Sequence, residues 1–582
     1  MTSTTLERDT TLRPDVPSDE IGNPPIITVL GAVTLSAALT GCGGGGGGDS
    51  TSPVVTPPVI GPVTVAPTAS QSARFLAQAS LAISDADLSV LQQQGYSDSI
   101  EAQIVAPRSQ SHWDWLVAKG YSDAAQFRNS QAGLDNTMWR KFITSPDLLR
   151  QRVVLALTEI FVVSPGGINT SWRQFVCGAY LDILDEHCFG TFRNLLEQIT
   201  LSIAMGSYLN MRGNQREDLA TGRQPDENYA REVLQLFSIG LVELNQDGTP
   251  RLSASGQPIE SYNPAMIAGL AKVFTGWDYS TTGPTLTTAP DRARVPMQFF
   301  AARFSPSVKS FLGVTIPAAT DGVTALSIAL DTIANHSNVA PFISRQLIQR
   351  LVTSNPSPAY VGRVAAAFNN TNGVRGDMKA VIRAVLLDVE ARTDDINPAS
   401  TWGKLREPML RFIQWARTFS ATSTADTWAI GDTSDTARAL GQSPLRAPSV
   451  FNFFRPGYVP PNSSIGSLGL VAPELQITNE SSVVGYSNYM QTTIGTGVGP
   501  TVAGVRDIRG NYAGELPRAN DPPGLVDRYA LLLTGDQLTA DTKSRIQTAI
   551  ASIDATTDAG RLNRIYAAVL LIMCSPEYLV QK

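Results

Sequence analysis

Apolar residues recur at intervals of three and four along most of the chain after residue 70, while segments that alternate apolar and polar residues are scarce. This spacing gathers apolar side chains on one face of an α-helix, whereas a half-buried strand needs a period of two. The sequence therefore predicts a mainly α protein with a large multi-helix globular body. The clearest predicted helices span residues 146–163, 192–204, 225–239, 264–274, 323–334, 339–352, 378–387, 405–419 and 562–573.

Breaks between the predicted helices follow no fixed period, so a helical-repeat architecture remains an alternative to one irregular body. Two helices are expected to begin alike, at Ser145-Pro146-Asp147 and Ser575-Pro576-Glu577, because each tripeptide offers a capping hydroxyl, a first-turn proline and an acid. Long irregular loops rich in Gly, Pro, Thr and Ser are predicted at 278–322, 420–436 and 456–528. Loops of this length are usually functional or face a partner, and surface decoration is the other interpretation.

The N-terminal segment carries an export pattern. Residues 26–41, IITVLGAVTLSAALTG, form an apolar run with the length of a signal-peptide core rather than of a membrane span. It ends in Leu39-Thr40-Gly41-Cys42, which resembles the bacterial lipobox, and six glycines and a Pro-rich stretch follow. We predict a signal peptide with lipobox at 1–42, a tether at 43–70 and a helical body at 71–582. A short buried helix with a chance cysteine is the alternative.

These features predict an exported protein anchored in the cell envelope through a lipid on Cys42. Residue Gly43 is not the aspartate that resembles an inner-membrane retention signal, so the outer membrane is favoured. The 45 basic and 51 acidic residues give a net charge of −6 without a basic stripe, which argues against a nucleic-acid partner.

Histidines and cysteines restrict the chemistry further. The three histidines, His112, His187 and His336, lie far apart, so we predict no histidine-based zinc site, although oxygen ligands remain open and no cofactor is indicated. Ten residues separate Cys177 from Cys188. These two cysteines either pair in an oxidising compartment or remain buried free thiols.

The segment PDENYARE at 225–232 is the most informative candidate site. Helical phasing puts Glu227, Asn228, Arg231, Glu232 and Gln235 on the face opposite Ala230. One interpretation is a capped helix with an exposed Glu227–Arg231 ion pair. The other is a catalytic site, in which Asp226 or Glu227 is the acid or base, Arg231 steadies an anion, and binding residues are supplied by Asn228, Tyr229 and Glu232.

Three further places carry candidate residues. His336 precedes a predicted helix, where it and Arg345 either hold an anion or serve helix capping. Trp277 follows a helix end and either stacks on a sugar ring or anchors the core. Asn452 and Arg455 lie in an aromatic loop and are candidates for binding or for packing.

Several blocks resemble the domain-of-unknown-function 1800 (DUF 1800) family. They are LRQRVVLALTEIFVVS (149–164), FGTFRNLLEQITLSIAMGSYLNMRGN (189–214), GRQPDENYAREVLQLFSIGLVELNQDG (222–248), LAKVFTGWD (270–278), the His336 region IANHSNVAPFISRQLIQR (333–350) and APSVFNFFRPGY (447–458). The resemblance implies an exported bacterial protein, often encoded beside a domain-of-unknown-function 1501 partner that resembles alkaline-phosphatase-like and sulfatase-like hydrolases. It implies no catalytic residue.

Two functions therefore remain open. The first is a binding or assembly protein of the envelope, a companion of the phosphatase/sulfatase-like partner. The second is an envelope hydrolase or lyase that acts on a glycan or another polymer. The chain has no GxSxG motif, P-loop or strand-linked GxGxxG, so serine-hydrolase and nucleotide-binding readings lack support.

Overall fold

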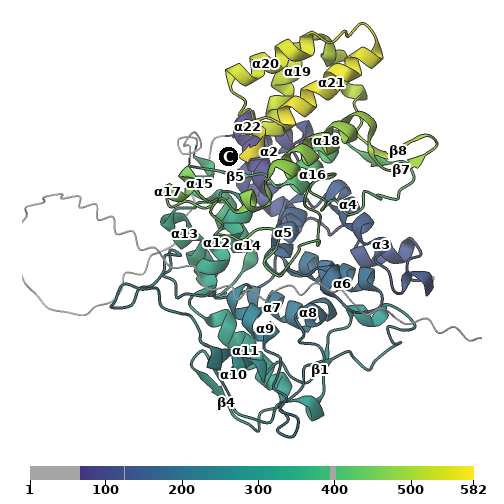
Figure 1. The fold of residues 1–582 in the computed structure, drawn as a ribbon. Helices are drawn as coiled ribbons and strands as arrows, with labels where there is room; N and C mark the ends of the chain where they lie inside the picture. The colour runs from purple at the N-terminus through teal and green to yellow at the C-terminus, as the bar shows by residue number, and fades with distance from the viewer. Residues whose placement is uncertain (1–65, 124, 394–400) are drawn as a thin grey trace, which may run out of the picture. The chain divides into compact units, whose positions relative to one another are not determined.

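A computed structural model describes residues 66–123, 125–393 and 401–582, so the expected signal peptide, Cys42 and nearly all of the expected tether lie outside the described residues. The described chain is mainly α, as the apolar spacing predicts (Figure 1). Thr68 caps the first described helix: its hydroxyl accepts a bond from the backbone N–H of Gln71, and its own backbone N–H donates to the Gln71 side chain. None of the described helices is both long enough and apolar enough to cross a membrane.

The first third of the body is built around a buried helix. All ten residues of α5 from Leu149 to Thr158 are buried. This helix packs against α2, α6 and α12 (Val339–Leu351), so even its polar residues Arg150, Gln151 and Arg152 are enclosed by protein. The helices of this part are α1 (Ala69–Ala79), α2 (Asp85–Val105), α3 (His112–Ala118), α4 (Leu134–Thr144), α5 (Leu148–Thr158), α6 (Arg173–His187), α7 (Phe192–Leu201), α8 (Ile203–Tyr208) and α9 (Asn228–Gln235).

The middle part contributes a second buried helix, α12, which packs against α5, α13 and α14. Helix α10 packs against α9, and α11 packs against α7. The helices of this part are α10 (Pro264–Ala271), α11 (Gly322–Asn335), α12 (Val339–Leu351), α13 (Pro358–Asn369), α14 (Met378–Leu387) and α15 (Val389–Arg392).

In the last part, α16 packs against α4, while α19, α20 and α21 pack on one another. Figure 1 shows these three helices together in yellow. The helices of this part are α16 (Pro408–Thr418), α17 (Ser464–Ser467), α18 (Glu480–Thr496), α19 (Pro522–Tyr529), α20 (Ala540–Ala551), α21 (Asp558–Met573) and α22 (Pro576–Leu579).

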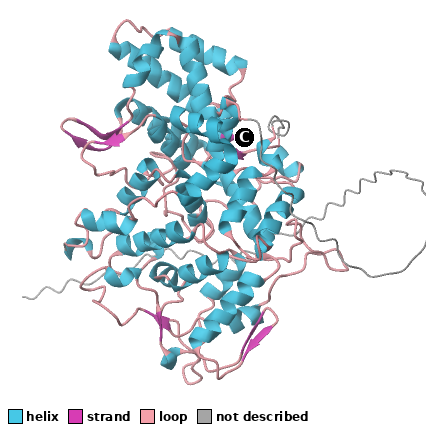
Figure 2. Ribbon diagram, turned by 180° about the vertical axis from the view of Figure 1, so that it is seen from behind, coloured by secondary structure: helices cyan, strands magenta, loops and turns pink. Residues whose placement is uncertain are grey.

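Strands are short and occur in small antiparallel sheets (Figure 2). The pairs are β1–β2, β3–β4 and β5–β9, and a three-stranded sheet has the order β6-β8-β7. Their bounds are β1 (Trp277–Asp278), β2 (Gln298–Phe299), β3 (Lys309–Phe311), β4 (Val314–Ile316), β5 (Lys404–Leu405), β6 (Thr422–Ser423), β7 (Val498–Val502), β8 (Val505–Arg509) and β9 (Val580–Gln581).

Two local predictions are wrong. Ser145 does not start a helix, because it ends α4, and α5 begins at Leu148 without a side-chain cap. The segment 456–528 is not one irregular loop, since it contains the 17-residue helix α18 and the β7–β8 hairpin. The second predicted start is confirmed, because the Ser575 hydroxyl accepts a hydrogen bond from the backbone N–H of Tyr578.

Candidate functional site

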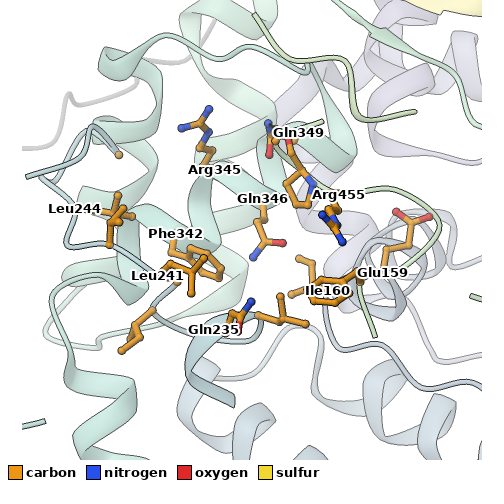
Figure 3. Close-up of a pocket in the computed structure, with 18 of the residues that line it drawn as sticks. Glu159, Ile160, Gln235, Leu241, Leu244, Phe342, Arg345, Gln346, Gln349 and Arg455 are labelled. Carbon is orange, nitrogen blue, oxygen red and sulfur yellow. Dashed lines mark hydrogen bonds between the residues drawn. The ribbon is translucent and has the colours of Figure 1, made fainter. Parts of the chain in front are cut away.

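The end of α5, the end of α9, helix α12 and the loop 450–457 enclose a cleft of about 560 Å³ (Figure 3). This volume is within the range of small-ligand sites. Each of the four walls comes from one of the blocks quoted above, at 149–164, 222–248, 333–350 and 447–458. Segments far apart in the sequence therefore meet at one recess.

The cleft walls are mostly apolar. Gly240 follows α9 with φ +72°, and a β-carbon there would lie 2.8 Å from the ring of Phe342. The glycine therefore lets the loop after α9 close against α12. The apolar lining residues are Ile160, Leu236, Ile239, Leu241, Val242, Leu244, Phe342, Val450 and Phe451.

Two polar residues of α12 fix the loop 450–457 to the cleft. Gln349 donates hydrogen bonds from Nε2 to the carbonyl of Ser354 at 3.0 Å and to that of Pro456 at 3.2 Å. The guanidinium of Arg350 lies 4.6 Å from the ring centre of Phe454. Both side chains are thus committed to holding the wall in place.

A buried charge network lies behind the cleft. Arg350 Nη1 lies 3.1 Å from Glu159 Oε2. The backbone carbonyl of Arg350 accepts hydrogen bonds from Arg152 Nη2 at 2.6 Å and from Lys404 Nζ at 2.9 Å. Lys404 also pairs with Glu407 and with Glu474, at 3.4 Å and 3.1 Å. Charges taken out of water are tolerated here because each one meets an opposite charge or a hydrogen-bond partner.

Glu159 and Glu407 are hydrogen-bonded to one another within this network, and their pKa values diverge. Burial and the neighbouring Glu407 raise the pKa of Glu159 well above its ordinary value. Burial alone would raise the pKa of Glu407 as well, but Lys404 and the bond from Glu159 lower it to about 2. Glu159 therefore carries the proton that the two carboxyl groups share, and Glu159 alone of the pair lines the cleft.

Four polar side chains of the cleft have no hydrogen-bond or ion-pair partner among the described residues. The amide of Gln346, which is only 7% exposed, has none, and the amide of half-buried Gln235 points toward it in Figure 3. Arg345 and Arg455 are exposed residues of the cleft lining. The Arg455 guanidinium contacts the ring of Phe451, 4.8 Å from the ring centre.

The structure places Asp226, Glu227 and Arg231 outside this cleft lining. Glu227 Oε2 lies 3.1 Å from Arg231 Nη2, with side chains 40% and 45% exposed. Asp226 accepts a bond from the backbone N–H of Asn228 at 2.8 Å, and its own backbone is bonded to Asn214. The ion-pair interpretation of this segment therefore describes its geometry, and the cleft lining begins beyond the segment, at Gln235 and Leu236.

The sequence predicts Glu232 on the polar face of its helix, but in the structure this residue is buried on the inner side of α9. The helix is shorter than expected and its buried face is wider. Its Oε2 has no hydrogen-bond partner in the described part of the chain, and burial raises the pKa of this carboxyl. Burial, followed by the charge of Glu232, raises the pKa of Tyr262 to about 12.

The remaining predicted binding residues serve the fold. Tyr229 is buried, and its hydroxyl lies 2.6 Å from that of Thr200. His336 ends α11, accepts a bond from the backbone N–H of Asn338 and lies outside the cleft lining. Trp277 is 4% exposed and packs on Phe299 with ring centres 5.5 Å apart.

Asn452 is buried in the loop 450–457 with φ +65°, next to the cleft rather than in its lining. Arg345 and Arg455 are the two predicted binding residues that the structure brings to the cleft. Across the described ranges, no group of three His, Cys, Asp or Glu side chains is arranged to hold a metal ion.

Cys177 and Cys188 are free, buried thiols, so of the two predicted alternatives the structure has the free thiols and not the disulfide. Cys177 lies within α6 and Cys188 ends it. A difference of eleven positions along a helix places them about 16 Å apart, far more than a disulfide spans.

The sequence places Gln235 on the polar face of its helix without indicating a binding role, and Gln346 and Glu159 are not among the predicted site residues. The polar residues Arg345, Gln346 and Gln349 follow Phe342 at helical spacing, which indicates a polar stripe on an otherwise apolar helix. Glu159 is a lone acid within the apolar run 153–163. A charged residue in such a run is rarely buried without a role in pairing or in chemistry, and this signal could have identified it.

Fold and site together define a mainly α protein with an apolar cleft backed by a buried charge network. The chain belongs to the family described as protein of unknown function (DUF1800), whose model matches residues 74–580. Comparisons with curated proteins and with solved structures found no match.

Proposed function

We propose that this protein is an exported envelope lipoprotein that binds a companion protein through the cleft between α5, α9 and α12. The observation that carries the proposal is the set of unpartnered polar groups, Gln235, Gln346, Arg345 and Arg455, among apolar walls. Gln346 is the buried member of this set, and because a buried polar group without a partner lowers stability, a ligand that supplies the missing bonds would offset that cost.

The proposed companion belongs to the domain-of-unknown-function 1501 family. The resemblance of this chain to the DUF 1800 family supports this choice, because members of that family are often encoded beside such a protein. The proposed anchor is a lipid on Cys42, with the outer membrane favoured. The lipobox-like tetrapeptide and the Gly/Pro-rich stretch after it support this location.

Co-purification from membranes tests the proposal. The full chain is isolated from the membrane fraction and its partners are identified by mass spectrometry. Leu241 lines the cleft and Leu252 does not, yet both are 58% exposed, so Leu241→Glu and Leu252→Glu form a matched pair. The companion should be lost from Leu241→Glu and retained by Leu252→Glu.

The lipid anchor has its own test. Cys42→Ala should move the protein from the membrane fraction to the soluble fraction while the companion remains bound. Retention of Cys42→Ala in the membrane fraction would contradict lipidation, and equal companion recovery from both leucine variants would contradict the cleft.

A hydrolase or lyase acting on a glycan or another polymer is the second candidate function. For this function, Glu159 is a better candidate for the catalytic acid than Asp226 or Glu227. Glu159 lines the cleft, and burial together with Glu407 raises its pKa, so it is suited to donate a proton. Purified full chain would then release soluble fragments from isolated envelope polysaccharide, and Glu159→Gln would not. Absence of fragments with the wild-type chain would exclude this candidate for that substrate.

A further inference from the structure

The cleft has polar groups at two different positions, and each position suits a different part of a ligand. Gln235 and Gln346 lie on opposite walls, and their amides point toward one another across the space between (Figure 3). Arg345 and Arg455 are the exposed cations of the lining. A ligand that fits must therefore satisfy amides inside the cleft and carry negative charge where the cleft meets solvent.

The amide pair favours a ligand that both donates and accepts hydrogen bonds. A glutamine side chain offers two N–H donors and one carbonyl acceptor. A peptide group presents its N–H and its C=O on opposite edges, so one peptide group between the two glutamines can bond to both. An alkyl chain in the same place would leave the buried amide of Gln346 without a partner, which is a net cost.

The apolar walls and the arginines of the cleft also indicate what kind of ligand fits. Leu241, Leu244, Phe342 and Val450 offer apolar surface in the same lining. The free guanidinium groups suit carboxylates, to which arginine can donate two parallel hydrogen bonds. No acidic side chain of the described residues pairs with Arg345 or with Arg455, so this charge is available to a ligand.

We propose that the cleft binds an extended peptide segment with apolar side chains and at least one carboxylate, held by Gln235 and Gln346 through its backbone and by Arg345 and Arg455 through its charge. This inference rests on the proposed function, because it takes the cleft as the binding site and names the chemistry of the segment that enters it. The mode resembles other peptide sites in which backbone bonds supply affinity and side-chain pockets supply specificity.

The experiment is selection from a library of random 12-residue peptides displayed on phage, with the full chain immobilised. Peptides that combine apolar residues with Asp or Glu should be enriched. A selected peptide is then synthesised with a fluorescent label, and its affinity is measured by anisotropy. Gln346→Leu and Arg455→Gln should each weaken binding at least tenfold.

The matched control is Arg438→Gln, since Arg438 is exposed, outside the cleft lining, and its guanidinium has no partner among the described residues. This variant should bind the peptide within twofold of the wild type. Absence of enrichment, enrichment of basic peptides, or binding that neither cleft variant weakens would overturn the inference.

Dodecanoate serves as the second probe, because it carries a carboxylate and an alkyl chain but no peptide group. Dodecanoate binding that depends on Arg455 but not on Gln346, without peptide enrichment, would identify an alkyl anion as the occupant and would also overturn the inference. The companion test is independent of this result. If Leu241→Glu loses the companion while no peptide is enriched, the peptide inference fails and the proposed function stands.

Discussion

Arg350 Nη1 lies 3.1 Å from Glu159 Oε2, and each of the two side chains is only 4% exposed. The pair joins α12 to the end of α5, which are the two buried helices that contribute to the cleft. Arg350 also stacks on Phe454, so the same guanidinium supports the loop 450–457. The back wall of the cleft is thus formed by a largely buried charge network.

Removing Arg350 from this network should be costly. Arg350→Met removes a buried cation that contacts Glu159 and helps to lower the pKa of Glu407, and we expect a loss of about 3–5 kcal/mol in the free energy of unfolding. Arg345→Met, five residues earlier on the same helix, removes an exposed and unpaired guanidinium and should change it by less than about 0.5 kcal/mol. Denaturant unfolding of the two variants measures the difference, and equal losses would contradict the role given to Arg350.

Glu159 predicts a specific pH dependence. Its pKa in the folded protein is raised above the ordinary value of 4.5, so the stability it contributes is fully present below about pH 4.5 and is lost as the pH rises through the folded pKa. Glu159→Gln keeps the bond to Glu407 and cannot ionise. The variant should therefore gain stability relative to the wild type as the pH rises, by at most about 1.4 kcal/mol per pH unit. Parallel stability profiles between pH 4 and pH 8 would contradict the shared proton.

Glu227→Gln should have little effect on stability. The Glu227–Arg231 pair is exposed, and such i,i+4 pairs contribute about 0.3–0.5 kcal/mol. The midpoint of thermal unfolding should therefore stay within about 1 °C of the wild type. A loss of several kcal/mol would show that this pair belongs to a buried network.

The cysteines of α6 should resist chemical labelling. Burial raises the pKa of Cys177 and of Cys188 to about 12, so neither carries a reactive thiolate near neutral pH. Mass spectrometry after iodoacetamide treatment should find both unmodified in the folded protein and both modified after unfolding without a reductant. A disulfide-linked peptide containing both residues would contradict the free thiols.

The helices could be predicted because their apolar periodicity is local. The expected segment 378–387 coincides with α14, and 339–352 differs from α12 by one residue. The start of α5 could not be predicted, because a Ser-Pro-Asp sequence suits a helix start and a helix end followed by a turn equally well. The two outcomes are distinguished only by the packing of α4 and α5.

The candidate site was predicted only in part. Arg345 and Arg455 were among the expected binding residues, and both reach the cleft. The burial of Glu232 and the convergence of Gln235 with Gln346 depend on how α9 packs against its neighbours, which no helical wheel specifies. Residue type indicates which side chains are polar, and helical phase indicates which of them share a face of a helix. Long-range contacts between helices decide which polar side chains meet.

The cleft keeps polar groups for a ligand, and these groups lower the free energy of unfolding of the protein without ligand. The most direct test is the free energy of unfolding of Gln346→Leu and Gln349→Leu without ligand. Gln346 has no partner, so Gln346→Leu should stabilise the protein by about 1–3 kcal/mol, whereas Gln349→Leu loses two hydrogen bonds and should destabilise it by about 1–2 kcal/mol. Destabilisation by Gln346→Leu as large as that by Gln349→Leu would mean that the amide of Gln346 serves the fold, and it would contradict the account.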